Sequence, residues 1–342
     1  MISRIIDEKA IVKAKGLIEQ AEHIVAICHT APDGDAIGSC LAATHVFSAI
    51  GKDIRTVIPD SHLFNLRDLP GAIDIVDATK YYDFAVKLLT DADLILCLDF
   101  NEPKRCGRLE KALCDSKAHK ILIDHHLNPN IEADVIISHP EVAATAYLFF
   151  RFLCRLEFFN LIDKKAAECV LAGMMTDTGN FSYNCDDPDM YVVVAELIRK
   201  GADKEKLYRQ LFATFSANCL RLNSYALLNK MEVYKDECAA LITLSRDELN
   251  RYHYTKGDTE GLVNKPLSIP GIVYSCFMRQ EADMIKISMR SVGDFPVNEL
   301  CSQYYGGGGH LNAAGGEYYG SLEDAAELFR SILKENKKRY IK

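Results

Sequence analysis

Short apolar runs alternate with amphipathic stretches over the first 200 residues of the chain. The apolar runs predict buried strands, at residues 24–28, 54–58, 94–98 and 120–123. Apolar positions spaced three and four residues apart predict helices, at residues 10–21, 36–50, 82–89, 143–156, 164–175 and 190–199. Strands that alternate with helices predict an α/β domain, with a mostly parallel sheet flanked by helices.

The pattern changes after Gly201. Residues 204–231 predict one long helix or a broken pair of helices, which we interpret as a connector. Beyond it, β-branched alternation predicts strands within residues 233–244, 271–280 and 284–290, followed by a glycine cluster and a helix at 322–336. We therefore expect a first domain at 1–203, a connector at 204–231, and a smaller α+β domain at 232–342.

The charge balance narrows the class of partner. Lys and Arg number 40 and Asp and Glu 48, so the formal net charge is −8. This charge argues against binding of duplex DNA through a broad basic face. It leaves open a short anionic substrate that is held by a few cationic side chains or by metal ions.

Membrane and disulfide signals are weak. The longest apolar run, at residues 142–150, is far shorter than the roughly 18–20 residues of a membrane-spanning helix. The N-terminal residues lack the apolar core of a secretory signal. The 12 cysteines include no C-x-x-C pair, which disfavours a zinc ribbon and is typical of reduced, mostly buried thiols. We expect a cytoplasmic protein without a membrane partner.

Acidic and histidine side chains follow four strand-like stretches of the first domain. The stretches end at residues 28, 98, 123 and 175, and the side chains that follow them are His29, Asp33 and Asp35, then Asp99, then Asp124, His125 and His126, then Asp177. A single aspartate after a strand is more often a helix cap or a turn residue. Parallel strands, however, bring their carboxyl ends to one edge of a sheet, where we expect Asp33, Asp35, Asp99 and Asp177 to face one another, with His29 and His125.

The side chains expected at this edge indicate a metal site. Four carboxylates carry a charge of −4, which two divalent cations would balance; without cations, some carboxylates would have to bind protons. Oxygen and imidazole ligands without a thiolate suit manganese, magnesium or iron-type ions better than a structural zinc site. Two such ions about 3.5–4 Å apart can activate a water and neutralise a phosphoryl group, so the pattern predicts phosphoester hydrolysis.

These residues resemble the four motifs of the DHH phosphoesterase superfamily: His29-x3-Asp33-x-Asp35, Asp99, Asp124-His125-His126 and Asp177. The run GGGGHLNAAG from Gly306 to Gly315 resembles the signature of the DHH-associated C-terminal domain. The match spans nearly the whole chain. Within the superfamily, the chain is most similar to the bifunctional oligoribonuclease (nanoRNase) and pAp phosphatase branch. These enzymes cut very short RNA, linear dinucleotides such as pApA, or the 3′-phosphate of pAp.

The resemblance implies two divalent cations, manganese first and magnesium or cobalt as alternatives, that share Asp99 as a bridging ligand. The other ligands of the first cation would be His29 and Asp33. Those of the second would be Asp35, His125 and Asp177. Two further residues would act in catalysis: Asp124 would orient its neighbours, and His126 would stabilise or protonate the scissile phosphate.

Substrate contacts are expected mostly from the second domain. Backbone N–H groups from Gly306 to Gly309 could form an anion nest, with Gly307, Gly308 and Gly309 as the expected substrate contacts, and His310 could contact phosphate. Four further residues could contact the substrate: Arg290 and Ser291, in a run that resembles the family's K-I-S-x-R-S segment, and Arg105 and Tyr305. Arginine suits phosphate, and one of Arg105 and Arg108 is expected to contact it. Tyr305, like Tyr304, could stack on a base or merely anchor the loop.

One stretch departs from the family pattern. The branch often has Ser-Thr-x-Glu where this chain has Ala144-Thr145-Ala146-Tyr147, which bears on substrate preference rather than on hydrolysis. The alternatives are the same chemistry on longer single-stranded nucleic acid or on pyrophosphate, and a nucleotide-binding regulator with a silent site. A homodimer is implied by the resemblance alone.

Overall fold

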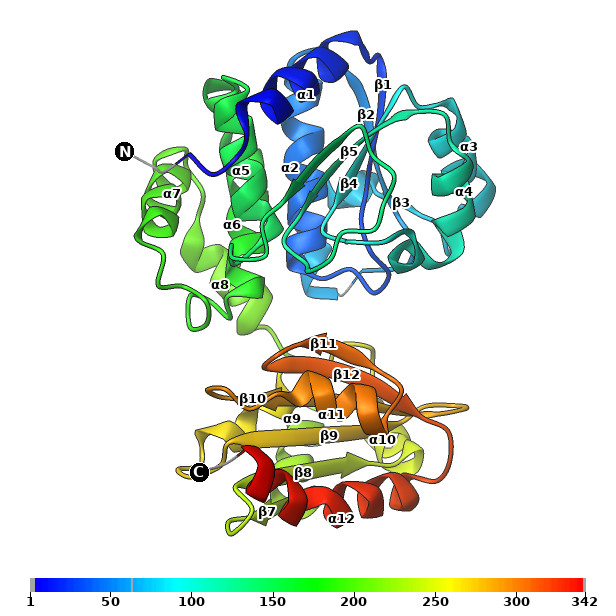
Figure 1. The fold of residues 1–342 in the computed structure, drawn as a ribbon, viewed down its shortest axis with the longest axis vertical. Coiled ribbons are helices and arrows are strands. Elements are labelled where there is room, and N and C mark those ends of the chain that lie inside the picture. Colours follow the sequence, from blue (N-terminus) through cyan, green and yellow to red (C-terminus); the bar gives the residue numbers. More distant parts are fainter. Residues whose placement is uncertain (1–3, 63, 341–342) are drawn as a thin grey trace. The chain divides into compact units, whose positions relative to one another are not determined.

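The computed structural model describes residues 4–62 and 64–340 and divides into two compact units, Met1–Thr214 and Phe215–Lys342 (Figure 1). The division falls inside the expected connector at 204–231. Helix α8 (Lys204–Phe212) belongs to the first unit, whereas α9 (Ala217–Tyr225) and the π-helical turn η5 (Ala226–Lys230) belong to the second. This segment is therefore a broken pair of helices, one in each unit.

The first unit is built on a six-stranded sheet in the order β3-β2-β1-β4-β5-β6. All of its strand pairs are parallel, as the sequence predicted. Its strands are β1 (His23–Ile27), β2 (Asp53–Ile58), β3 (Val76–Asp77), β4 (Leu94–Leu98), β5 (His119–Asp124) and β6 (Val135–Ser138). Strands β3 and β6 were not predicted, because two and four residues at the sheet edges are too short to carry a periodic pattern.

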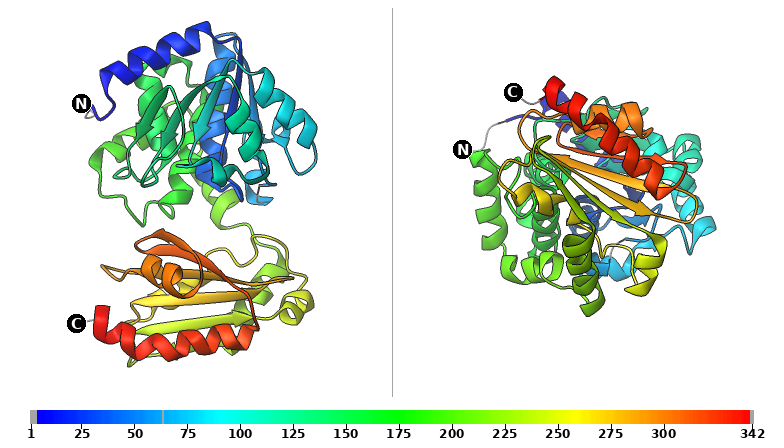
Figure 2. Two further views of the ribbon diagram at one scale, coloured as in Figure 1. Left: turned by 45° about the vertical axis from the view of Figure 1, so that its right-hand side comes forward. Right: turned by 90° about the horizontal axis from the view of Figure 1, so that it is seen from below.

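Helices cover both faces of this sheet (Figures 1 and 2). One core cluster joins the sheet to α1 (Glu8–Gln20), α2 (Gly34–Ala49), α5 (Thr145–Arg155), α6 (Lys164–Asp177), α7 (Pro188–Arg199) and α8. A second cluster joins the opposite face to α3 (Tyr82–Asp91), η3 (Pro103–Leu109) and α4 (Glu110–Asp115). Along β4, Leu94, Leu96 and Leu98 point into the first cluster and Ile95 and Cys97 into the second, which is why this strand is apolar throughout.

Two glycines allow the helices of the first face to approach closely. A Cβ at Gly38 of α2 would lie 2.4 Å from the Cys169 carbonyl oxygen of α6. A Cβ at Gly173 of α6 would lie 2.6 Å from the Cβ of Ala146 in α5. Helices α2, α5 and α6 thus meet almost backbone to backbone, and this contact brings together the residues at their ends.

The helix predicted at 164–175 is α6, and the apolar stretch at 170–175, which is strand-like in composition, forms the last part of this helix. Every residue from Val170 to Met175 is buried, because α6 packs among α2, α5, α7 and α8. A helix that other helices surround has little polar face, so the second half of α6 is an uninterrupted apolar run. Asp177 therefore ends a helix and does not follow a strand.

Among the described residues, no helix is long and apolar enough to cross a membrane.

The second unit contains a mixed six-stranded sheet in the order β11-β12-β10-β9-β8-β7. Its strands are β7 (Met231–Tyr234), β8 (Ala239–Leu244), β9 (Tyr274–Gln280), β10 (Ile285–Ser291), β11 (Gly308–His310) and β12 (Ala313–Tyr318). Only β8 and β9 pair in parallel. Helices α10 (Arg246–Arg251), α11 (Val297–Tyr304) and α12 (Leu322–Tyr340) complete the α+β fold that the sequence predicted.

Candidate metal centre

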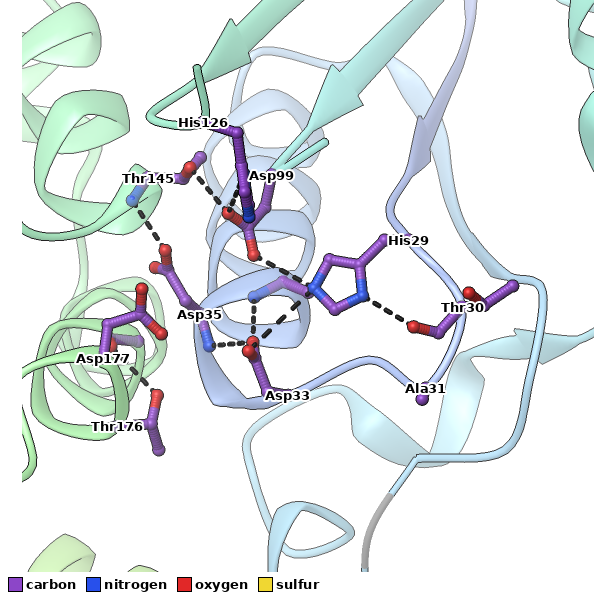
Figure 3. A network of polar contacts seen from close by, with 12 residues as sticks. His29, Thr30, Ala31, Asp33, Asp35, Asp99, His126, Thr145, Thr176 and Asp177 are labelled. Atoms are coloured by element: carbon purple, nitrogen blue, oxygen red, sulfur yellow. Dashed lines mark hydrogen bonds and ion pairs between the residues drawn. The ribbon is translucent and has the colours of Figure 1, made fainter. Parts of the chain in front are cut away.

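The loop after β1 and the first turn of α2 supply three polar side chains, His29, Asp33 and Asp35, to the carboxyl edge of the first sheet (Figure 3). Asp33 caps α2, since its Oδ1 accepts the N–H groups of Asp35 at 3.0 Å and Ala36 at 3.1 Å. Asp35, in the first turn of α2, is completely buried. The Nδ1 atom of His29 lies 2.7 Å from the Thr30 carbonyl oxygen. A proton on Nδ1 would donate to that oxygen and leave Nε2 as an acceptor.

Asp99 is the central carboxylate of the edge. It follows β4 in a left-handed backbone conformation (φ 65°), and its side chain is almost fully buried. His29 Nε2 lies 3.3 Å from Asp99 Oδ2, and His125 Nε2 lies 3.5 Å from Asp99 Oδ1. The two oxygens of Asp99 therefore face two different histidines.

A second set of residues surrounds His125. Its Nε2 atom lies 3.2 Å from Asp177 Oδ2, and its Nδ1 atom lies 3.2 Å from the Val142 carbonyl oxygen. The next residue, His126, pairs through Nδ1 with Asp124 Oδ1 at 2.7 Å. Asp124 is completely buried at the end of β5, so it can hold the His126 ring in one orientation.

The ligand atoms of these side chains are close enough to hold cations. In each of three groups they lie within 4.8 Å of one another: His29, Asp33 and Asp99; Asp35, His125 and Asp177; and Asp99, His125 and His126. The donors are carboxylate oxygens and imidazole nitrogens, which suit manganese or magnesium. The first two groups are the two ligand sets that the family resemblance implies, and Asp99 lies between them.

The electrostatics of the edge also favour cations. Burial raises the pKa of the Asp35 carboxyl, and the nearby charges of Asp99 and Asp177 raise it further. Burial and the charges of Asp33 and Asp99 hold the pKa of Asp177 at about 6, although a hydrogen bond with His125 opposes them. Burial lowers the pKa of His29, but its hydrogen bond to Asp99 and the charges of Asp33 and Asp99 outweigh burial and raise the pKa to about 10. Without cations, the site therefore holds protons against carboxylate repulsion.

Three residues expected to contact substrate, Arg105, Arg290 and Ser291, differ in exposure and in hydrogen-bond partners. Arg105 is exposed in η3, and its carbonyl oxygen accepts the Thr30 N–H at 2.6 Å, so it lies beside the His29 loop. Arg290 is half-buried in β10, where its Nη1 donates to the Met289 carbonyl oxygen at 2.9 Å. Ser291 is buried; its Oγ donates to the Phe295 carbonyl oxygen and accepts from Asn312, so it braces this part of the second unit.

Part of the glycine run forms a strand. Gly308, Gly309 and the exposed His310 form β11, which pairs antiparallel with β12, and the Gly307 N–H donates to the Cys301 carbonyl oxygen. Of the two roles left open for Tyr305, stacking on a base and anchoring the loop, the structure supports anchoring. The Tyr305 ring is 1 % exposed in the core, and its hydroxyl donates to the Ala325 carbonyl oxygen. Tyr305 therefore anchors the segment before the glycines.

Thr145 is a residue of the site that sequence reasoning missed. It is fully buried at the start of α5, and its hydroxyl donates to Asp99 Oδ1 at 2.9 Å. Its backbone N–H and that of Ala146 donate to the two oxygens of Asp35. Thr145 matches the threonine of the family's Ser-Thr-x-Glu pattern, and the departures lie on either side of it, at Ala144 and Tyr147. A threonine at a helix start does not by itself predict such contacts.

Comparisons with known proteins agree with this geometry. Residues 23–174 match the DHH family, N-terminal domain, and residues 241–336 match the DHHA1 domain. The crystal structure of an exopolyphosphatase-related protein from Bacteroides fragilis is 44% identical, with a TM-score of 0.96 over 98% of this chain and 99% of that one. The bifunctional oligoribonuclease and PAP phosphatase NrnA of Bacillus subtilis is 26% identical over 305 residues, 89% of this chain and 91% of that protein. Its namesake from Thermus thermophilus is 28% identical over 316 residues, 90% and 88% of the two chains.

Proposed function

Because this chain belongs to the DHH family of phosphoesterases, we propose that it hydrolyses phosphoester bonds of short nucleotides with two divalent cations, manganese in the first place. Its substrates are short oligoribonucleotides and linear dinucleotides of the pApA type, which it cuts to mononucleotides, and pAp, from which it removes the 3′-phosphate. A homodimer stays a prediction.

The observation that carries the proposal is the gathering of two ligand groups around Asp99. His29 and Asp33 lie on one side of this carboxylate, and His125, with Asp35 and Asp177, on the other. Two divalent cations held there would supply an activated water and neutralise the charge of the phosphoryl group. Asp124 would fix the ring of His126 through Nδ1, which leaves Nε2 to stabilise or protonate the phosphate.

The substrate class rests on two further observations. The net charge of −8 suits a substrate of a few nucleotides better than a long polyanion. In addition, this chain matches nearly the full length of the two relatives that are named oligoribonucleases and PAP phosphatases. Length agreement supports a common substrate class, whereas an identity of 26–28% leaves the ranking of substrates open.

The test is a substrate comparison with metal-free protein to which manganese is added. We would follow release from pAp, pApA, a five-mer RNA, a 24-mer single strand and pyrophosphate in parallel. We expect turnover of the first three that falls steeply with length. Turnover confined to the 24-mer or to pyrophosphate would overturn the substrate class, and no turnover of any substrate would favour a regulator with a silent site.

A matched pair of variants tests the metal chemistry. Asp99→Asn removes the shared carboxylate charge, and we expect kcat to fall by about 1000-fold, which corresponds to about 4 kcal/mol of transition-state stabilisation. Asp134→Asn removes a carboxylate that pairs with His119 at 3.1 Å near the start of β5 and should leave kcat unchanged. A folded Asp99→Asn variant with the full rate would contradict the two-metal mechanism.

A further inference from the structure

The first turn of α5 holds two of the proposed metal ligands at once (Figure 3). The Thr145 N–H donates to Asp35 Oδ2 at 2.6 Å, and the Ala146 N–H donates to Asp35 Oδ1 at 2.8 Å. The Thr145 hydroxyl donates to Asp99 Oδ1 at 2.9 Å. Thr145, Asp35 and Asp99 are all buried, so water does not compete for these hydrogen bonds.

Asp35 serves α5 as a cap that comes from another helix. Ala144 occupies the N-cap position of α5 and makes no side-chain hydrogen bond there. The carboxylate of Asp35, in α2, supplies the missing acceptor for the first free N–H groups of α5. Each of its oxygens accepts one N–H and keeps a second lone pair, which a cation can use.

The hydroxyl of Thr145 selects how the Asp99 carboxylate is turned. It binds Oδ1, the oxygen that lies 3.5 Å from His125 Nε2, whereas Oδ2 lies 3.3 Å from His29 Nε2. The hydroxyl therefore keeps one oxygen of Asp99 toward each ligand group. Without this donor, the carboxylate can twist about its Cβ–Cγ bond and turn an oxygen away from one group.

The position of α5 is itself fixed by its surroundings. A Cβ at Gly173 would lie 2.6 Å from the Ala146 Cβ and 2.9 Å from Asp35 Oδ1, so only glycine lets α6 pass this close. In the same turn of α5, the Tyr147 hydroxyl donates to Asp187 Oδ2 at 2.8 Å, and Arg151 donates to the Tyr147 hydroxyl. Tyr147 occupies the position of the glutamate in the family pattern and here ties α5 to the start of α7.

We propose that Thr145 is a positioning residue whose hydroxyl sets the affinity of the centre for divalent cations by orienting the Asp99 carboxylate, next to the backbone N–H groups of the same turn that hold Asp35. The inference rests on the proposed two-metal function and adds to it a residue that binds neither cation nor substrate. Hydrogen-bond partners that orient metal ligands typically change metal affinity by about 10–100-fold when they are removed.

The experiment compares three variants of the full chain. Thr145→Val keeps the shape of the side chain and removes the donor, Thr145→Ser keeps the donor, and Thr56→Val removes a buried hydroxyl that bonds Thr44 and Cys40 instead. Manganese binding to metal-free protein is measured by calorimetry, and kcat and KM for pApA are measured at rising manganese concentrations. Circular dichroism of the metal-free variants checks folding.

We expect Thr145→Val to weaken manganese binding by about 10-fold or more, with Thr145→Ser and Thr56→Val close to the unsubstituted protein. Excess manganese should restore most of kcat, since the defect lies in metal binding, and KM for pApA should change little. If Thr145→Val does not fold, Thr145→Ala removes the same hydroxyl without adding bulk and is measured in its place.

Three results would overturn the inference: unchanged manganese affinity in the variant without the hydroxyl, an equal loss in Thr145→Ser, or an equal loss in Thr56→Val. Absence of manganese binding by the unsubstituted protein is a different failure. It would remove the proposed function itself and, with it, the basis for assigning this role to Thr145.

Discussion

Two glycines in the run at residues 306–309 differ in the space available for a side chain. A Cβ at Gly307 would lie 1.9 Å from the Gly315 carbonyl oxygen, whereas a Cβ at Gly308 would meet nothing within 4 Å. We predict that Gly307→Ala destabilises the protein by at least about 2 kcal/mol, because the backbone of β12 cannot yield. Gly308→Ala should leave the melting temperature unchanged and raise KM for pApA several-fold if β11 contacts phosphate.

Thermal unfolding and steady-state kinetics of the two variants separate these effects. The same melting temperature in Gly307→Ala and in the unsubstituted protein would contradict the packing argument. An unchanged KM in Gly308→Ala would show that this glycine does not contact the substrate. Neighbours such as His310 would then be the remaining candidates for this contact.

In the second unit, residue type alone did not predict which side chains are buried and which are exposed to a substrate. Tyr304 and Tyr305 are adjacent and chemically identical, yet Tyr305 lies in the core and Tyr304 is half-buried. Ser291, next to Arg290 in the run that resembles the family's K-I-S-x-R-S segment, is buried and accepts a hydrogen bond from the Asn312 side chain. Arg290 and Ser291 are successive residues of β10 and face opposite sides of the sheet, whereas Tyr304 and Tyr305 end α11 and point away from it in different directions. In both places only the fold decides which side is covered.

At the scale of elements, the contact between α2 and α6 positions the proposed metal ligands. We predict that Gly38→Ala destabilises the protein by about 1–3 kcal/mol, since its Cβ would lie 2.4 Å from the Cys169 carbonyl oxygen and push the helices apart. It should also weaken manganese binding, because Asp35 and Asp177 lie at the ends of these helices.

Gly16→Ala is the matched control for this prediction. Gly16 lies inside α1, and a Cβ there would meet nothing within 4 Å. Alanine should stabilise α1 by about 0.5–1 kcal/mol through its higher helix propensity. Chemical denaturation of both variants gives the comparison, and equal stabilities would contradict the close packing of α2 on α6.

On the scale of the whole molecule, the aspartate and histidine side chains of the candidate metal centre make the free energy of unfolding depend on pH. The pKa of Asp177 is raised from 3.8 to about 6 and that of His29 from 6.5 to about 10, so the folded protein holds both protons more tightly than the unfolded chain. The contribution of Asp177 to the free energy of unfolding is complete below pH 3.8 and is lost as the pH rises to about 6. The contribution of His29 is complete below pH 6.5 and is lost as the pH rises to about 10.

We predict that the melting temperature of metal-free protein falls between about pH 5.5 and pH 8.5, whereas stabilisation by manganese grows over the same range, because metal ligands must lose their protons. Thermal unfolding with a chelator and with excess manganese measures both trends. His29→Gln should flatten the first trend, and His23→Gln, which alters an exposed pair with Asp53, should not. If the melting temperature of the metal-free protein rose with pH, the claim that the folded site holds these protons more tightly than the unfolded chain would be refuted.

Much of the candidate site could be predicted from the sequence, because its residues sit at strand ends and their spacing carries a family resemblance. His29, Asp99 and His125 follow β1, β4 and β5, and parallel pairing brings these ends together whatever the details of packing. The α/β and α+β classes followed equally from local periodicity.

The tertiary structure decided what depends on contacts between distant segments. Asp177 reaches the site from the end of a buried helix, and Thr145 joins it because Gly38 and Gly173 let three helices touch. Tyr305 anchors its segment because the second core encloses it. Local sequence encodes the period of an element and the chemistry at its end, whereas burial and hydrogen-bond partners across elements exist only once the chain has packed.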